Sequence, residues 1–214
     1  MRIIFLFILV GIVASTTSCN NSSAGKTFCD TTCSTDSFKF KGENPFHPVV
    51  AIGVNKCKVD SILWTYDLVS GRLVSFPEFI GQPVSLNKNA IDCFFKDTSY
   101  AWLQFNDCIT GRGFLLKLSY DKNKETRKIT GAFTRFDPKF SIDPALIAYT
   151  DRGSVFVENM ETAQQAIMPF DNAYDIEFNK LHETVDSVNI TKSRVFVKMI
   201  RNGQEKVYEK KISL

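Results

Sequence analysis

Two short segments contain the residues whose types and spacing are best suited to chemistry. Thr110-Gly-Arg-Gly113 and Thr150-Asp-Arg-Gly153 share a pattern, and each precedes an apolar segment. The charged side chains at these segments are Asp107, Arg112, Asp151 and Arg152. If both segments are turns at one edge of the fold, these side chains would form a rim that could hydrogen-bond a polar ligand. In the simpler interpretation, the glycines permit tight turns and the charges are solvated.

Few other residues are suited to catalysis. The chain has two histidines, His47 and His182, and His182-Glu183 lacks the second histidine that a zinc-protease helix requires. Neither a Gly-x-Ser-x-Gly motif nor a Gly-rich phosphate loop occurs. We therefore predict a non-catalytic binding or interaction module without a cofactor or metal. The alternative is a hydrolase whose site lies at the repeated turns, with His182 and Glu183 as further candidates.

The chain has six cysteines, and their context favours disulfides over a zinc site. Besides Cys19 they are Cys29, Cys33, Cys57, Cys93 and Cys108. Because five is odd, at least one thiol has no partner within this set. Cys93 and Cys108 flank a segment that could form a hairpin, and we predict that they pair. Cys29 and Cys33 are close enough to bridge, whereas a Cys33–Cys57 bond would better tie the N-terminal segment to the body.

Strands must position these residues. The chain contains 19 Phe and many Val, Ile and Thr, and no long segment has helical periodicity. Asn202-Gly203 separates two apolar segments and predicts a β-hairpin. One short helix is expected at about 173–182. The composition therefore predicts an all-β fold.

A repeat of about 40 residues refines this prediction. Thr110 and Thr150 are 40 positions apart, as are Gly113 and Gly153, and a further step from Val155 leads to Val195. Each unit consists of short apolar segments separated by polar turns. The period predicts propeller-like repeats in antiparallel meanders. A β-sandwich is the alternative.

The N-terminal segment has the composition of an export signal. Arg2 precedes the apolar run Ile3–Ala14, which is too short to span a bilayer, and small polar residues lead to Cys19. This order predicts a lipoprotein signal peptide at 1–18 and lipid attachment at Cys19, although Thr16 stands where an aliphatic residue is usual. A lipidated tether would then cover 19–36, and a single all-β domain 37–214.

The charge balance and the signal together indicate a location. The formal net charge of +3 argues against an electrostatic nucleic-acid binder. We predict a lipoprotein of the bacterial cell envelope, on the outer membrane, that contacts the membrane through its N-terminal lipid. Its ligand would be an envelope protein or a glycan. A secreted protein is the alternative, for which Asn189-Ile190-Thr191 would be a glycosylation acceptor.

Several strings in the chain resemble those of a known group of proteins. They are Cys29-Asp-Thr-Thr-Cys33, Asn106-Asp-Cys-Ile-Thr-Gly-Arg-Gly113, Ala148-Tyr-Thr-Asp-Arg-Gly153 and His182-Glu-Thr-Val-Asp-Ser-Val-Asn189. From Cys29 to the C-terminus, the chain resembles an uncharacterised family of Bacteroidetes-type lipoproteins. The resemblance implies the envelope location and a single domain, and it implies no catalytic residue.

Overall fold

The computed structural model describes residues 28–29, 34–66, 71–169 and 177–214. The expected signal peptide, Cys19 and Cys33 lie outside these ranges. Strands are the dominant element of the described chain, and its few helices are short, which confirms the all-β prediction. Among these residues, no helix is both long enough and apolar enough to cross a membrane.

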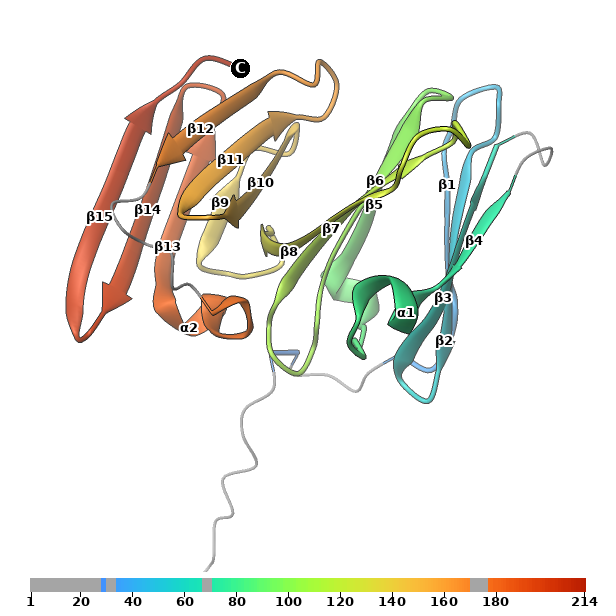
Figure 1. The fold of residues 1–214 in the computed structure, drawn as a ribbon, viewed down its shortest axis with the longest axis horizontal. Coiled ribbons are helices and arrows are strands. Elements are labelled where there is room, and N and C mark those ends of the chain that lie inside the picture. Colours follow the sequence, from blue (N-terminus) through green and yellow to red (C-terminus); the bar gives the residue numbers. More distant parts are fainter. Residues whose placement is uncertain (1–27, 30–33, 67–70, 170–176) are drawn as a thin grey trace, which may run out of the picture.

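The strands form three open sheets (Figure 1). The N-terminal sheet contains, in spatial order, β1 (Phe38–Lys41), β2 (Val49–Asn55), β3 (Lys58–Thr65) and β4 (Arg72–Ser75). The central sheet contains β12 (Gln165–Pro169), β11 (Ser154–Asn159), β10 (Leu146–Asp151), β8 (Arg127–Phe133), β7 (Gly113–Ser119), β6 (Tyr100–Asn106) and β5 (Ile91–Lys96). The C-terminal sheet contains β15 (Gln204–Lys211), β14 (Arg194–Arg201), β13 (Val185–Thr191) and β9 (Phe140–Ile142), and its β9–β13 pair is parallel.

Short helices complete the described elements. They are α1 (Phe76–Ile80), η1 (Lys88–Ala90), η2 (Phe178–Lys180) and α2 (Leu181–Thr184). The expected helix at 173–182 overlaps η2 and the start of α2, and its first residues lie outside the described ranges. Pro77 at the start of α1 and Gly81 at its end are typical helix boundaries.

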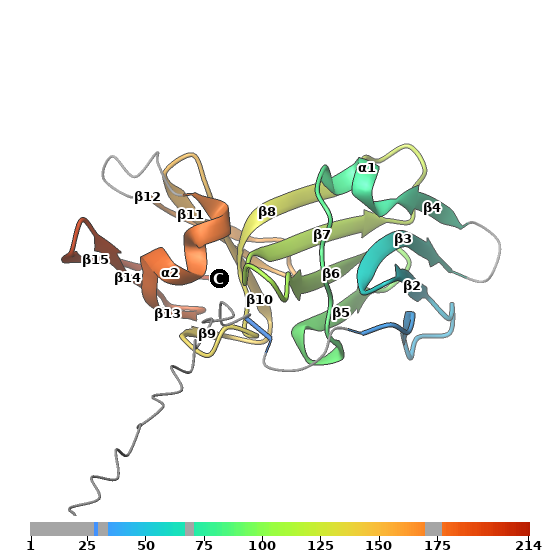
Figure 2. The ribbon, with the colours of Figure 1, turned by 90° about the horizontal axis from the view of Figure 1, so that it is seen from below.

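Successive side chains of the central strands point to opposite faces of the sheet, so neighbouring residues belong to different cores. On β6, Leu103 and Phe105 join a core shared with the N-terminal sheet, whereas Trp102 faces the opposite side. On β10, Ala148 joins a core shared with the C-terminal sheet, and Tyr149 shares the side of Trp102. One face of the central sheet is therefore covered by a different sheet at each end (Figures 1 and 2).

The central sheet is curved, so that the two ends of its other face approach each other. The Tyr100 hydroxyl on β6 donates a 2.8 Å hydrogen bond to the carbonyl of Met160, which follows β11. Lys117 on β7 likewise reaches Glu158 on β11. Because these contacts join strands that are not neighbours in the sheet, the bend encloses a third core that contains Trp102 and Tyr149.

The 40-residue repeat corresponds to three antiparallel meanders, but these meanders are not separate blades. They comprise β6–β7–β8, β10–β11–β12 and β13–β14–β15. The first two are joined by β8–β10 pairing, with Phe133 opposite Ala148, and so become one sheet. The structure therefore shows antiparallel sheets packed in layers and does not show the predicted propeller-like arrangement, because edge pairing merged two of the repeats.

The hairpin predicted at Asn202-Gly203 is confirmed. Arg201 is paired with Gln204, and both turn residues have positive φ (52° and 74°), as a two-residue hairpin turn requires.

The cysteine pairing differs from the prediction. Cys29 is bonded to Cys108, and Cys93 is a free thiol. In the β5–β6 hairpin Cys93 lies opposite Leu103, so Cys108, beyond the end of β6, is out of its reach. The Cys29–Cys108 bond also excludes a Cys29–Cys33 bridge. Cys57 is disulfide-bonded as well.

Candidate binding site

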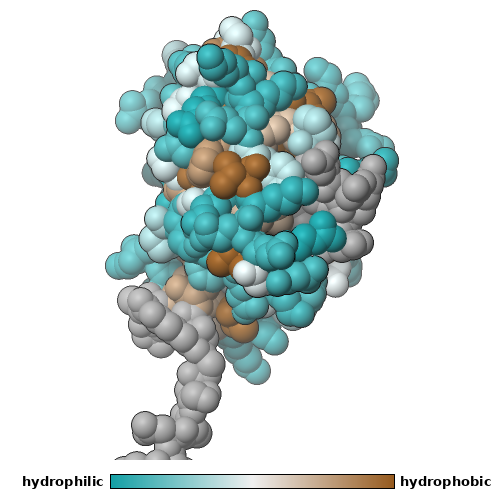
Figure 3. Space-filling view, turned by 90° about the vertical axis from the view of Figure 1, so that its left-hand side faces the viewer, coloured by the Kyte–Doolittle hydropathy of each residue, from teal (hydrophilic) through white to brown (hydrophobic). Residues whose placement is uncertain are grey.

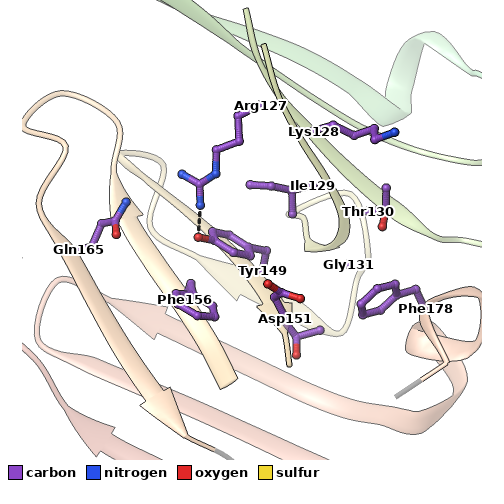
Figure 4. A pocket seen from close by; sticks show the side chains of 11 residues that line it. Arg127, Lys128, Ile129, Thr130, Gly131, Tyr149, Asp151, Phe156, Gln165 and Phe178 are labelled. Carbon is purple, nitrogen blue, oxygen red and sulfur yellow. Dashed lines mark hydrogen bonds between the residues drawn. The ribbon is translucent and has the colours of Figure 1, made fainter. Parts of the chain in front are cut away.

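A pocket of roughly 380 Å³ lies on the inner side of the bent central sheet (Figure 4). Its walls come from β8, β10, β11, β12 and η2. The residues lining it are Arg127, Lys128, Ile129, Thr130, Gly131, Tyr149, Thr150, Asp151, Phe156, Gln165 and Phe178. This lining combines aromatic rings, cations and hydrogen-bonding groups, which is typical of sites for small polar ligands.

A stack of side chains forms one wall. Tyr149 and Phe156 are cross-strand partners, and their rings stack at 5.1 Å with an interplanar angle of 6°. The Arg127 guanidinium lies 5.1 Å from the Tyr149 ring centre and donates a hydrogen bond to its hydroxyl. Burial raises the pKa of Tyr149, and the Arg127 cation opposes this shift. The wall is therefore an aromatic stack capped by a cation.

A buried carboxylate holds this stack in place. Glu158 is 1% exposed and accepts hydrogen bonds from Lys117 (3.1 Å), Arg127 (3.0 Å) and Gln165 (2.8 Å). A buried carboxylate is stable only when its charge and its hydrogen-bonding capacity are both compensated. Since the cations Lys117 and Arg127 share this one carboxylate, the three charged side chains together carry a net positive charge.

Phe178 of η2 forms the opposite wall, and β8 has a glycine where the ring lies. A Cβ at Gly131 would stand 2.7 Å from Phe178 Cε1 and 2.7 Å from the carbonyl oxygen of Thr150, so only glycine allows this approach. The Arg112 guanidinium lies over the rings of both Phe178 (5.4 Å) and Phe114 (5.3 Å). These contacts fix the position of the wall.

Arg112 is itself anchored. Its Nε donates to the carbonyl of Thr130 at 2.8 Å, and its Nη1 donates to Gln82 Oε1 at 2.9 Å. Burial lowers the pKa of Arg112, and the charge of Asp107 opposes that shift. Arg112 therefore supports Phe178 from behind.

The four predicted rim residues have different positions. Asp151 is exposed and lines the pocket, and Arg112 stands behind Phe178. Asp107 is 4% exposed and accepts hydrogen bonds within its own turn and from Ser85. Arg152 is exposed in the β10–β11 turn and is not part of the lining. The structure thus brings Asp151 into the same pocket lining as Phe178, and Arg112 lies over the Phe178 ring. Ligand binding at this rim stays a prediction.

A histidine–aspartate pair is the second notable cluster. His182 Nδ1 lies 2.5 Å from Asp137 Oδ2, and Asp137 is completely buried. Asp137 also accepts a hydrogen bond from the Lys139 amide (3.0 Å), whereas Glu183 is exposed. Sequence reasoning missed the pair because its members are 45 positions apart with no motif between them.

Sequence reasoning also missed the aromatic wall. Tyr149, Phe156 and Phe178 are among many aromatic residues in apolar segments, and only the strand register places the first two side by side. Their alternation along the strands fixes a face of the sheet but gives no sign that this face contains a pocket.

The outer face of the C-terminal sheet is a less suitable site. It is largely hydrophilic, with separated hydrophobic spots (Figure 3). Ile200 and Val207 on this sheet are 42% and 54% exposed, and charged residues occupy much of the edge strand β15. Such charges protect an edge strand against pairing with another chain.

Within the described part of the chain, no group of three or more His, Cys, Asp or Glu side chains is arranged to hold a metal ion. No protein-family model, curated protein or solved structure matches this chain.

Proposed function

We propose that this protein is a non-catalytic binding protein of the bacterial cell envelope and that its pocket holds a saccharide unit of an envelope glycan. The arrangement of the half-buried Phe156 and Phe178 rings beside Asp151 and Gln165 carries this proposal. Sugars present apolar C–H faces that pack on aromatic rings, and hydroxyls that need donors and acceptors nearby. The pocket offers both within one volume.

The anchor is a separate part of this proposal. The export signal and Cys19 support attachment to the outer membrane through lipid, in agreement with the resemblance to uncharacterised Bacteroidetes-type lipoproteins. Mass spectrometry of the membrane-extracted N-terminus tests it, because an acylated Cys19 is expected. An unmodified residue at another cleavage site would contradict the anchor and favour a secreted protein.

A glycan-array screen followed by calorimetry tests the pocket. Asp151→Ala and Phe178→Ala are each expected to weaken binding about tenfold, since each removes a contact inside the pocket. Asp60→Ala, at an exposed position in the N-terminal sheet, is the matched control and should leave the affinity unchanged. Binding that neither pocket variant weakens would place the ligand elsewhere. No binding to any envelope glycan would reject this ligand class.

The Asp137–His182 pair favours a hydrolase as a second candidate. The buried carboxylate fixes the imidazole through Nδ1, which leaves Nε2 for proton transfer. His182 also lies against Gly111, within the first repeated turn. In a broad hydrolase screen, any activity found should be lost in His182→Ala and kept in Glu183→Ala. Activity that survives His182→Ala, Asp107→Asn and Asp151→Ala would dispose of this site.

A further inference from the structure

The first described residues of the chain lie at the junction between the two ends of the central sheet. Residues 28–29 appear there as a short blue segment in Figures 1 and 2. Cys29 is bonded to Cys108 in the β6–β7 turn, and its amide donates to the Cys108 carbonyl at 3.3 Å. The N-terminal segment is thus fastened to the turn that also contains Arg112.

Phe28 fills the space between this turn and α2. Its ring meets the His182 ring edge-on, with a centroid distance of 5.2 Å and an angle of 85°. Gly111 leaves room for it, because a Cβ there would stand 2.7 Å from Phe28 Cδ2 and 3.3 Å from His182 Cβ. Phe28 therefore contacts both the central sheet's turn and the helix that packs on the C-terminal sheet.

His182 in turn fixes the segment that carries the pocket wall. Its ring is hydrogen-bonded to Asp137, and the Lys139 ammonium donates to the carbonyls of His182 and Val185. Because η2 runs directly into α2, Phe178 is only four residues before His182. A shift of α2 would move Phe178 as well.

We propose that Phe28, clamped by the Cys29–Cys108 disulfide, positions the Phe178 wall and so couples the N-terminal segment at residues 28–29 to the pocket. Two contact routes carry the coupling. One runs from Phe28 through His182 along α2 and η2. The other runs along the backbone of the 107–112 loop, from Cys108 to Arg112, whose guanidinium lies over the Phe178 ring. The inference rests on the proposed function only in treating this pocket as the binding site.

Hydrogen exchange of the full exported chain tests the coupling without any ligand. Phe28→Ala and the double variant Cys29→Ala/Cys108→Ala should each speed amide exchange at 178–185 about tenfold, with exchange in β14 unchanged. Phe46→Ala is the matched control for the first, since Phe46 is 45% exposed and lies in the β1–β2 connection. Cys93→Ala, which removes the free thiol, is the control for the second.

Two results would overturn the proposal. One is unchanged exchange at 178–185 in a folded Phe28→Ala protein. The other is an equal acceleration in β14, which would show general destabilisation. Should the double cysteine variant fail to fold, Phe28→Ala decides alone because it keeps the disulfide. A pocket that binds no glycan would leave this measurement unaffected, so the two proposals fail separately.

Discussion

The two turns that contain the repeated strings Thr110–Gly113 and Thr150–Gly153 share a sequence pattern and differ in almost every structural respect. The first is a loop of six residues between Asn106 and Gly113, and its carboxylate, Asp107, is buried. The second is a two-residue hairpin turn in which Arg152 and Gly153 both have positive φ (43° and 75°). Its carboxylate, Asp151, is exposed at the pocket.

The difference shows that a shared pattern need not give a shared role. In the first turn Asp107 organises the loop, because it accepts from the amides of Ser85 and Thr110 and from the Thr110 hydroxyl. In the second, the backbone conformation closes the turn without help from the carboxylate, which leaves Asp151 available to a ligand. Substitutions in the two turns should therefore have unequal effects.

The largest contrast is expected between the two aspartates. Asp107→Ala should lower the free energy of unfolding by about 4 kcal/mol, because it leaves buried donors without an acceptor. Asp151→Ala should change it by no more than about 0.5 kcal/mol, as is usual at exposed positions. Urea unfolding with the disulfides intact measures both. Asp107→Asn, which keeps one acceptor oxygen, should fall between them, and equal losses in the two alanine variants would refute the contrast.

The glycines give the next contrast, and for different reasons. A Cβ at Gly113 would stand 2.2 Å from the carbonyl oxygen of Ala132, so Gly113→Ala must push β7 and β8 apart at a cost of about 3 kcal/mol. Gly153→Ala forces alanine into a left-handed backbone conformation (φ 75°), which costs about 1 kcal/mol. Thermal unfolding of the two variants shows which of them loses more stability. A larger loss of stability in Gly153→Ala than in Gly113→Ala would contradict our interpretation.

The arginines should change stability in opposite directions. Arg112→Ala removes two cation–π contacts and two hydrogen bonds, at a cost of about 2 kcal/mol. Arg112→Lys controls for charge and should recover only part of the loss, because an ammonium cannot stack as a planar fork does. The shift of the denaturation midpoint, at an unchanged m-value, gives the change in the free energy of unfolding. An Arg112→Ala variant as stable as the original protein would show that Arg112 does not support Phe178.

The smallest expected effect is a gain of stability. Arg152 occupies a left-handed conformation that asparagine adopts more readily, so Arg152→Asn should raise the free energy of unfolding by about 0.5 kcal/mol. The same denaturant measurement detects it. A loss instead would mean that the Arg152 side chain makes a contact that matters.

Local sequence patterns predicted the strands but not their assembly. The apolar segments after Gly113 and Gly153 became β7 and β11, and Asn202-Gly203 became a hairpin, because side-chain alternation and turn chemistry act over a few residues. Whether neighbouring meanders pair at their edges depends on long-range contacts such as Phe133 with Ala148, on which a repeat period carries no information.

The candidate site was predictable only in part. Asp151 and Arg112 were chosen from the turn pattern, and both stand beside Phe178. Phe178 itself lies close to Gly131 only through folding. Pairing of Cys108 with Cys29, 79 positions away, was equally hidden, because disulfide partners are set by proximity in space and not by spacing in sequence.

By itself the sequence determined that this chain forms strands, where several of its turns fall, and that its N-terminus has the composition of an export signal. These properties depend on side-chain type, alternation and backbone freedom within short segments. Tertiary structure alone decided that two repeats merge into a bent sheet, that Asp107 is buried while Asp151 is exposed, and that Tyr149, Phe156 and Phe178 enclose a pocket. Burial and proximity are properties of the packed chain, because each depends on residues that are distant in sequence.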